Sequence, residues 1–151
     1  MIEVEVEVLS TELPDLRARY DREARLIEVP VIDGVPWPHG VNVVGLLIID
    51  LTSDLAIANF DVLVPRTRWR PGLPALVDPA PPGLARLRIT PEAVLTQSLD
   101  GSVDVFRSRD GSTVQVLIGE PSRVSVLALT TSCQALIADR KLFGFQLTLS
   151  R

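Results

Sequence analysis

Apolar and charged residues alternate strictly over residues 2–8, and this is the clearest pattern in the chain. Isoleucine and valine occupy the even positions, while Glu3, Glu5 and Glu7 occupy the odd ones. A period of two places the apolar side chains on one face of a β-strand and the carboxylates on the other. We therefore predict a half-buried strand over Ile2–Val8. Its carboxylates repel one another, so we expect them beside arginines or at a sheet edge.

The most apolar part of the chain predicts the centre of the sheet. The run Val41–Ile49 is interrupted only by one asparagine and one glycine, and its many β-branched residues favour a strand covered on both faces. Asp50–Asp54 follows with the short polar side chains of a turn. A second apolar run, Leu55–Val64, comes next. The simplest arrangement is an antiparallel hairpin that turns at Asp50–Asp54.

Two segments have the pattern of short helices. Over residues 11–24 the apolar residues recur at helical spacing after a hydroxyl residue that can cap a helix. Residues 91–99 begin with a proline that suits the first helical position and follow Thr90, a second capping residue. Between them, residues 25–32 return to strand-like composition, with Pro30 indicating an edge or a bulge.

Proline marks the irregular parts. Asp33–Gly40 contains two prolines and two glycines and is predicted to be a loop. Pro65–Gly83 contains six of the twelve prolines, which predicts an extended, polyproline-like strap outside the sheet. Leu73, Leu76 and Val77 indicate that this strap packs on the rest of the protein.

The second half of the chain predicts strands in series, with an Asp-Gly hairpin turn at Asp110–Gly111. The expected strands are 84–89, 103–107, 113–118, 124–129, 135–138 and 142–149. The fold class is thus mainly β, either all-β or α+β. We expect an antiparallel barrel or sandwich of roughly eight to ten strands with one or two short helices.

Composition limits the class of protein. A chain of 151 residues with 46% hydrophobic and 23% charged residues predicts one folded domain over 1–151. The net charge of −4 disfavours nucleic acid as a partner, because counterion displacement needs a basic excess. No apolar stretch is long enough for a transmembrane helix, so the cytoplasm is the expected location. An exported chain whose signal has been removed would have the same composition.

Groups for catalysis are scarce. His39 is the only histidine and Cys133 the only cysteine, so a Cys/His metal cluster or a His-based triad cannot form. Asp50 and Asp54 flank a turn, but the loop lacks the alternating ligands of a calcium site, and turn hydrogen bonding explains them better. We therefore predict no catalytic residue, no metal and no cofactor.

Charged residues recur at period two in three places. Arg66, Arg68 and Arg70 would share one face of an extended chain, opposite Trp69, while residues 3–7 and 86–88 show the same spacing. Pairing across neighbouring strands on a solvated face is the favoured interpretation. A stripe for an anionic ligand and a contact between subunits are the alternatives. The candidate binding residues are Arg66, Arg68, Trp69, Arg70, Trp37 and His39.

Three functions follow from these patterns. The first is a non-catalytic interaction module that self-associates or docks a protein partner through the arginine- and proline-containing segment. The second is a carrier of a lipid or other apolar ligand inside a curved sheet. The third, a small enzyme, is the least favoured because the catalytic groups are few.

Overall fold

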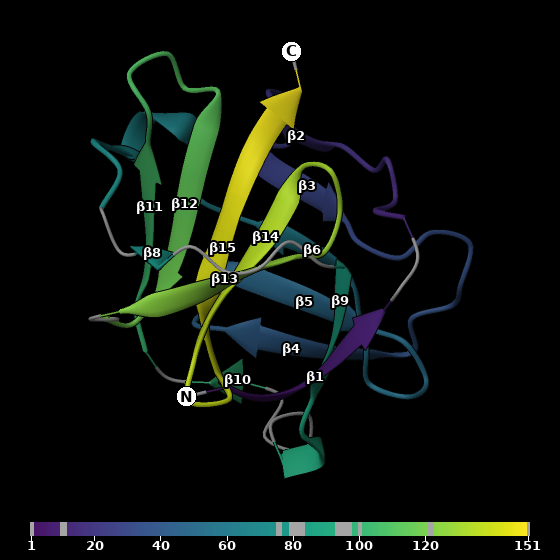
Figure 1. Ribbon diagram of the computed structural model, residues 1–151. Coiled ribbons are helices and arrows are strands. Elements are labelled where there is room, and N and C mark those ends of the chain that lie inside the picture. Colours follow the sequence, from purple (N-terminus) through teal and green to yellow (C-terminus); the bar gives the residue numbers. More distant parts are fainter. Residues whose placement is uncertain are drawn as a thin grey trace.

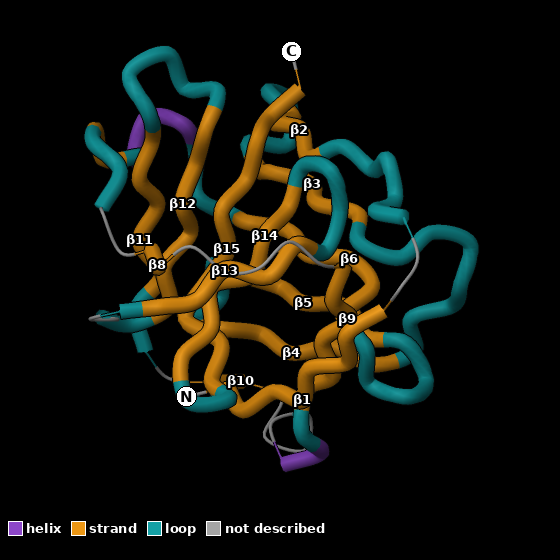
Figure 2. The backbone as a smooth tube through the Cα atoms, viewed as in Figure 1, coloured by secondary structure: helices purple, strands orange, loops and turns teal. Residues whose placement is uncertain are grey.

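The computed structural model describes residues 2–9, 12–74, 77–78, 84–92, 98–99, 101–120 and 123–150. These residues form one mixed β-sheet that curls into an open half-barrel (Figures 1 and 2). The strands of the first half are β1 (Ile2–Leu9), β2 (Ala18–Asp21), β3 (Leu26–Pro30), β4 (His39–Val43), β5 (Leu47–Leu51), β6 (Ile57–Val62), β7 (Arg70–Pro71) and β8 (Val77–Asp78). Those of the second half are β9 (Leu84–Ile89), β10 (Ser98–Leu99), β11 (Val103–Arg107), β12 (Thr113–Ile118), β13 (Val124–Ala128), β14 (Cys133–Ala138) and β15 (Lys141–Ser150).

The prediction of a mainly β protein is confirmed, but the finer prediction of an antiparallel barrel or sandwich is wrong. The order along the sheet is β1-β9-β13-β14-β15-β2-β3-β6-β5-β4-β10, and β12, β11 and β7 extend from β15 in turn. Several pairings are parallel, among them β15 with β2 and β10 with β4. The described residues form fifteen strands rather than roughly eight to ten. Three of them, β7, β8 and β10, are only two residues long.

Strand β15 connects the two halves of the sheet. It pairs with β14, with β12, with the start of β1 and, at its end, with β2. Phe145 of β15 stacks on Phe60 of β6 with ring centroids 4.0 Å apart, and both side chains are fully buried. The main hydrophobic core therefore lies on the inner face of the curl, between β6 and β15 (Figure 1).

The first strand forms as predicted, although its apolar face is only half covered. Ile2 and Val4 are buried, whereas Val6 is 41% exposed and Val8 is 74% exposed. Strand β9 pairs with β1 in antiparallel register. Glu5 lies opposite Arg88, so the predicted pairing of the glutamates with arginines is confirmed for this pair of strands.

The helix predicted over residues 11–24 is wrong. Residues 12–17 are irregular, and β2 and β3 then form an antiparallel hairpin. The Asp21 carboxylate accepts hydrogen bonds from the N–H groups of Glu23 and Ala24, at 2.9 and 3.0 Å, and thereby closes the turn. The residues at helical spacing do not make a buried stripe, since Leu13 and Ala24 are exposed.

The second predicted helix, residues 91–99, is not formed as one element. Pro91 and Glu92 are helical, residues 93–97 lie outside the described part, and Ser98–Leu99 form β10. The short strand β10 pairs with β4 in parallel, so backbone pairing across the sheet has replaced helical bonding at the end of this segment.

The central hairpin turns twice rather than once. The run Val41–Ile49 is not one strand: β4 ends at Val43 and β5 begins at Leu47. Three residues connect the two strands. Val44 and Gly45 both have positive φ, 47° and 73°, as the central residues of a type I′ turn require, and the Leu46 N–H closes this turn by donating to the Val43 carbonyl at 3.0 Å. The Asn42 side chain accepts from the Gly45 N–H at 2.7 Å. A turn does form between β5 and β6, but it spans residues 52–56 rather than Asp50–Asp54, because Asp50 and Leu51 still pair with Asn59 and Ile57.

The proline-rich strap joins the sheet at two points, contrary to the prediction. Arg66–Arg68 form a 3₁₀ turn, β7 pairs with β11, and β8 pairs with β13. Pro71 is tolerated because β7 is a two-residue strand at the end of the pairing path, where a missing N–H costs little. Leu76 lies outside the described residues, as do residues 79–83.

The predicted loop ends earlier than expected, because His39 and Gly40 already belong to β4. In the described part of the chain, no helix has the length and apolar character that crossing a membrane requires.

Candidate functional site

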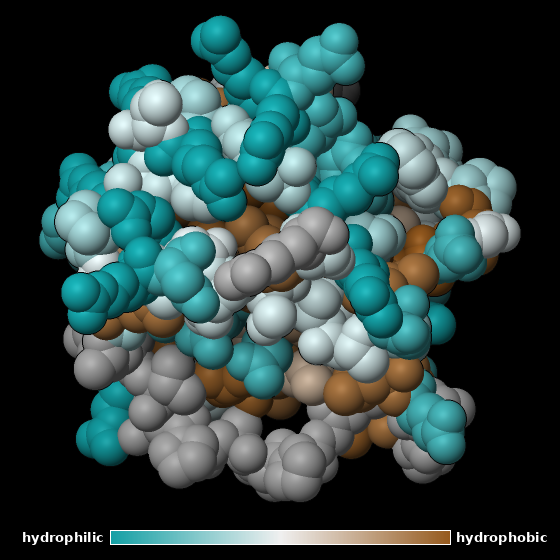
Figure 3. Space-filling model, turned by 90° about the horizontal axis from the view of Figure 1, so that it is seen from above, coloured by the Kyte–Doolittle hydropathy of each residue, from teal (hydrophilic) through white to brown (hydrophobic). Residues whose placement is uncertain are grey.

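A pocket of about 370 Å³, called the mouth pocket below, opens where the hydrophobic core reaches the surface. Its floor is made of core side chains from β6, β9 and the ends of β3 and β13, all of them buried. The floor residues are Val31, Ile57, Ala85 and Leu129. Leu9, Pro14, Leu16 and Ile32 form the walls, and Glu12, Asp15, Asp33 and Arg86 complete the lining. The pocket is thus an extension of the core with charged groups around it. Figure 3 shows the molecule from above. Apolar surface is visible there between polar side chains, among other places on the right, which is the side on which Figure 1 shows the loops after β1 and β3.

The wall formed by residues 12–17 is fixed by hydrogen bonds to the turn at Thr130–Ser132. The Ser132 hydroxyl donates to the Leu16 carbonyl at 2.7 Å and accepts from the Ala18 N–H at 2.8 Å. The Thr131 N–H donates to the Pro14 carbonyl at 3.0 Å. These bonds tie an irregular segment to the β13–β14 hairpin and hold this wall of the pocket in place.

The charged side chains that line the pocket are mostly acidic. Asp15 accepts from the Thr131 hydroxyl at 3.1 Å and lies 3.8 Å from the Arg17 guanidinium. Glu12, Asp33 and Arg86 form no ion pair with any residue that the structure describes. Around the apolar cavity, Glu12 and Asp33 therefore stand as two carboxylates beside Arg86, while Asp15 is paired with Arg17.

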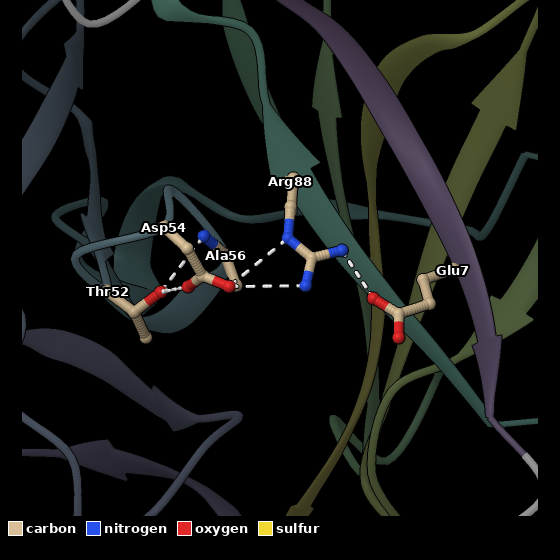
Figure 4. A network of polar contacts seen from close by, with 5 residues as sticks. All are labelled: Glu7, Thr52, Asp54, Ala56 and Arg88. Carbon is tan, nitrogen blue, oxygen red and sulfur yellow. Dashed lines mark hydrogen bonds and ion pairs between the residues drawn. The ribbon is translucent and has the colours of Figure 1, made fainter.

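Figure 4 shows a network of polar contacts centred on Arg88, which lies two residues along β9 from the pocket residue Arg86. The Arg88 guanidinium donates to the Asp54 carboxylate at 3.2 and 3.3 Å and pairs with Glu7 on its other side. The Thr52 hydroxyl donates to Asp54 and accepts from the Ala56 N–H at 3.1 Å. The hydrogen bond from Thr52 and then those from Arg88 hold the pKa of Asp54 below its ordinary value. The network ties β9 to β1 and to the β5–β6 turn.

A second hollow, of about 470 Å³, adjoins the first, because Ile32 and Arg86 line both. Its other lining residues come from the β5–β6 turn and from the loop after β3, including Val35 and Pro36. Arg86 therefore stands between two adjoining hollows, with its half-buried stem in the wall of each.

The arginine stripe does not form. Arg66 and Arg68 lie in the 3₁₀ turn, so the three arginines do not share one extended face. The Arg66 guanidinium lies 5.4 Å from the Tyr20 ring centroid and 5.5 Å from that of Trp69. Arg70 pairs with Asp104 at 3.3 Å.

Trp69 is part of the core. Its side chain is only 5% exposed, and its indole N–H donates to the Val64 carbonyl at 2.9 Å. The ring meets Tyr20 edge to face at 5.2 Å between centroids. The indole consequently presents little surface to a partner.

Trp37 and His39 are exposed and lie apart from the 3₁₀ turn. Trp37 is 50% exposed and lines a polar hollow of about 420 Å³ over β2, β3 and β6, whereas Arg66 lines another hollow. In the Trp37 hollow, burial and then the charges of Asp50 and Glu28 raise the pKa of Asp61 above its ordinary value. The six predicted residues therefore do not form one site.

The remaining candidate groups have structural partners. Asp50 accepts from the Asn59 amide at 3.0 Å, while Asp54 bonds to Thr52 and Arg88, so the two aspartates turn to different neighbours. Within the described ranges no group of three residues is arranged to hold a metal ion. Cys133 is fully buried, and this burial raises the pKa of its thiol.

The mouth pocket was not found from the sequence. Its lining comes from six separate segments whose proximity depends on the strand order, and no local pattern marks them.

The chain matches no model of a known protein family, and a comparison with curated proteins finds no significant match.

Proposed function

We propose that the protein is a non-catalytic binder of a small molecule with an apolar body, held in the mouth pocket. The observation that supports this most directly is the floor of the pocket, which is built from fully or nearly fully buried core side chains yet opens to solvent. A volume of about 370 Å³ lies in the range of roughly 300–1,000 Å³ that is typical of ligand sites.

Preorganisation supports the same proposal. The wall at Pro14–Leu16 is bonded to the β13–β14 hairpin through Thr131 and Ser132. Binding would then order few side chains, which leaves more of the apolar contact energy to appear as affinity. Each Å² of apolar ligand surface that is buried contributes roughly 25 cal/mol before such costs are subtracted.

The charges select the polar end of the ligand. Of the three lining carboxylates, Asp15 pairs with Arg17, while Glu12 and Asp33 form no ion pair with a described residue and outnumber the one lining cation, Arg86. An anionic head group meets a net repulsion there, while an amine meets an attraction. The preferred ligand in this proposal has an apolar body and a neutral or cationic end.

This ordering of functions differs from that given by sequence alone. The interaction module was first expected at the segment of Arg66, Trp69 and Arg70, but the Trp69 indole is buried and Arg70 is paired with Asp104. The apolar-ligand carrier, the second expectation, now has a located cavity, and it becomes the leading proposal.

The test blocks the pocket and compares ligand ends. Leu16→Trp places a large ring in the wall, and Leu13→Trp, on the same segment but exposed and outside the lining, is the matched control. Nile red fluorescence should rise with wild type and Leu13→Trp and stay low with Leu16→Trp.

Displacement of Nile red by competing ligands then measures which head group the pocket prefers. Decylamine and decanol should displace the dye at lower concentration than decanoate, and Glu12→Gln with Asp33→Asn should narrow the difference. Equal dye binding by the two tryptophan variants would remove the pocket from consideration. A preference for decanoate would reject the charge argument while leaving the pocket in place.

A further inference from the structure

Strand β1 has one paired edge and one largely free edge. Its pairing with β9 extends from Val4 to Leu9, while β15 reaches only Ile2 and Glu3 on the other side. The Val4 N–H donates to the Arg140 carbonyl at 2.8 Å, and no further described residue bonds to this edge. Figure 1 shows the later part of β1 diverging from β15.

The free edge presents both backbone groups and apolar side chains. Backbone groups alternate between the two edges of a strand, so Val6 and Val8 direct their N–H and C=O groups to the same side as Val4. Their side chains are 41% and 74% exposed, the latter the largest exposed fraction among the big apolar residues described. An exposed strand edge of this kind is a template for another strand.

The charges on β1 disfavour a second copy of the same strand. In an antiparallel β1–β1 pair, Glu3, Glu5 and Glu7 of one copy would face the same glutamates of the other. Like charges directly opposite each other destabilise a strand pair. The three glutamates therefore disfavour pairing of this edge with β1 of another copy.

The paired edge shows which sequence does fit. Arg86 and Arg88 of β9 lie opposite Glu7 and Glu5, and Leu87 lies between them opposite Val6. A strand that alternates arginine or lysine with apolar residues thus satisfies both faces of β1 at once. Because both edges of β1 present the same side chains, a second strand of that pattern fits the free edge.

We propose that the free edge of β1, over residues 5–8, docks an extended segment of a partner protein in which basic and apolar residues alternate. The partner's backbone bonds to Val6 and Val8, its apolar side chains pack on the two exposed valines, and its basic side chains face Glu3 and Glu5. This surface is separate from the mouth pocket, whose only β1 residue is Leu9.

The experiment uses the full chain and the peptide acetyl-Thr-Arg-Val-Arg-Val-Arg-Thr-amide at low salt. Amide exchange measured by NMR should show fast exchange at Val6 and Val8 in the free protein and protection when the peptide is bound. The amides of Glu5 and Glu7 face β9, so they should be protected in both states. A peptide with glutamate in place of arginine should not bind.

Two variants separate strand pairing from simple charge attraction. Val6→Pro removes one N–H of the free edge and none that faces β9, and Glu5 before it already has the extended conformation that a following proline needs. This variant should weaken peptide binding about tenfold or more while the protein stays folded. Glu3→Gln with Glu5→Gln should weaken it at low salt and reduce its salt dependence. Glu23→Gln with Glu120→Gln, also exposed, is the control and should bind as wild type.

The outcomes decide the proposal. Unchanged binding by Val6→Pro, or no protection at Val6 and Val8, would show that the peptide only adheres to an acidic surface and would overturn it. Protection of the same amides in the peptide-free protein, together with a dimer in sedimentation, would assign the edge to a second copy instead. Leu16→Trp should leave peptide binding unchanged, so failure here and failure of the pocket proposal are distinguishable.

Discussion

Gly144 is the position where one added methyl group should do the most damage. It lies in β15, opposite Leu117 of β12 and beside an irregularity in the pairing of β15 with β14. A Cβ placed there would come within 1.9 Å of the Val116 carbonyl oxygen and 3.1 Å of the Leu117 Cα. Those atoms belong to the backbone of the neighbouring strand and cannot rotate away. The backbone φ of +146° is also one that residues with a Cβ rarely adopt.

The cost of Gly144→Ala has two parts. An unfavourable φ contributes about 1–3 kcal/mol, and forcing an extra group into a filled interior typically contributes another 1–3 kcal/mol. We expect a loss of about 2–6 kcal/mol, against a total stability of about 5–15 kcal/mol for a domain. The strain would fall on β15, the strand that joins the two halves of the sheet.

Urea unfolding followed by circular dichroism measures this loss. Gly101→Ala is the matched control, because Gly101 has nearly the same φ, +142°, but nothing within 4 Å of its added Cβ. The control isolates the backbone part, so Gly144→Ala should be the more destabilising of the two. Equal losses for the two variants would refute the steric argument, and a loss below about 0.5 kcal/mol for Gly144→Ala would refute the described path of β15.

Four further predictions concern stability and activity. Ile49→Ala should cost about 2–5 kcal/mol in urea melts, whereas Ile48→Ala, on the half-buried face, should cost clearly less; the reverse order would mean that the face of β5 is misassigned. Trp69→Phe keeps an aromatic side chain but replaces the buried indole with a smaller ring that cannot donate to the Val64 carbonyl, and the lost hydrogen bond alone should cost about 1–3 kcal/mol in urea melts. The pKa of Asp54 is lowered in the folded state, so its ionised form stabilises the fold above the unfolded value of 3.8, and this stabilisation is lost as the pH falls through the folded pKa. The melting temperature of Asp54→Asn should therefore fall less than that of wild type as the pH drops below 3.8. An unchanged pH profile of the melting temperature would contradict this. His39→Ala should change any activity that is found by no more than a few fold, and a loss of orders of magnitude would reject a non-catalytic protein.

Local pattern predicted what depends on near neighbours. The alternation over residues 2–8 predicted β1, and the short polar residues predicted a turn between β5 and β6, although Asp50 and Leu51 belong to β5. The Asp-Gly signal placed the turn between β11 and β12, where the Asp110 carboxylate accepts from the Ser112 N–H at 3.0 Å. In each case the side chains that fix the structure lie within a few residues of one another.

Local pattern failed where two structures fit the same residues. Residues 11–24 have apolar residues at helical spacing, but the strand pairing of β2 with β3 and of β2 with β15 outweighs a weak helical preference. The pattern of Val41–Ile49 predicts one strand interrupted by Asn42 and Gly45. In the structure, Gly45 lies in a turn between two strands, and the Asn42 side chain accepts a hydrogen bond from its N–H. The parallel pairings, which join segments far apart in sequence, have no local signal at all.

Arg86 and Arg88 show why the candidate site could not be predicted from the sequence. The two arginines share one face of β9 by simple alternation, and the same pattern predicts the same environment for both. In the structure Leu55 accepts from the Ile89 N–H at 2.9 Å and Ala56 bridges to Arg88, so the β5–β6 turn lies against one end of β9. That turn brings Asp54 to Arg88 and leaves Arg86 two residues away with no ion pair to a described residue, at the mouth of the apolar pocket. The difference between a structural arginine and one available to a ligand is therefore set by where a distant hairpin docks, which no spacing within residues 84–89 encodes.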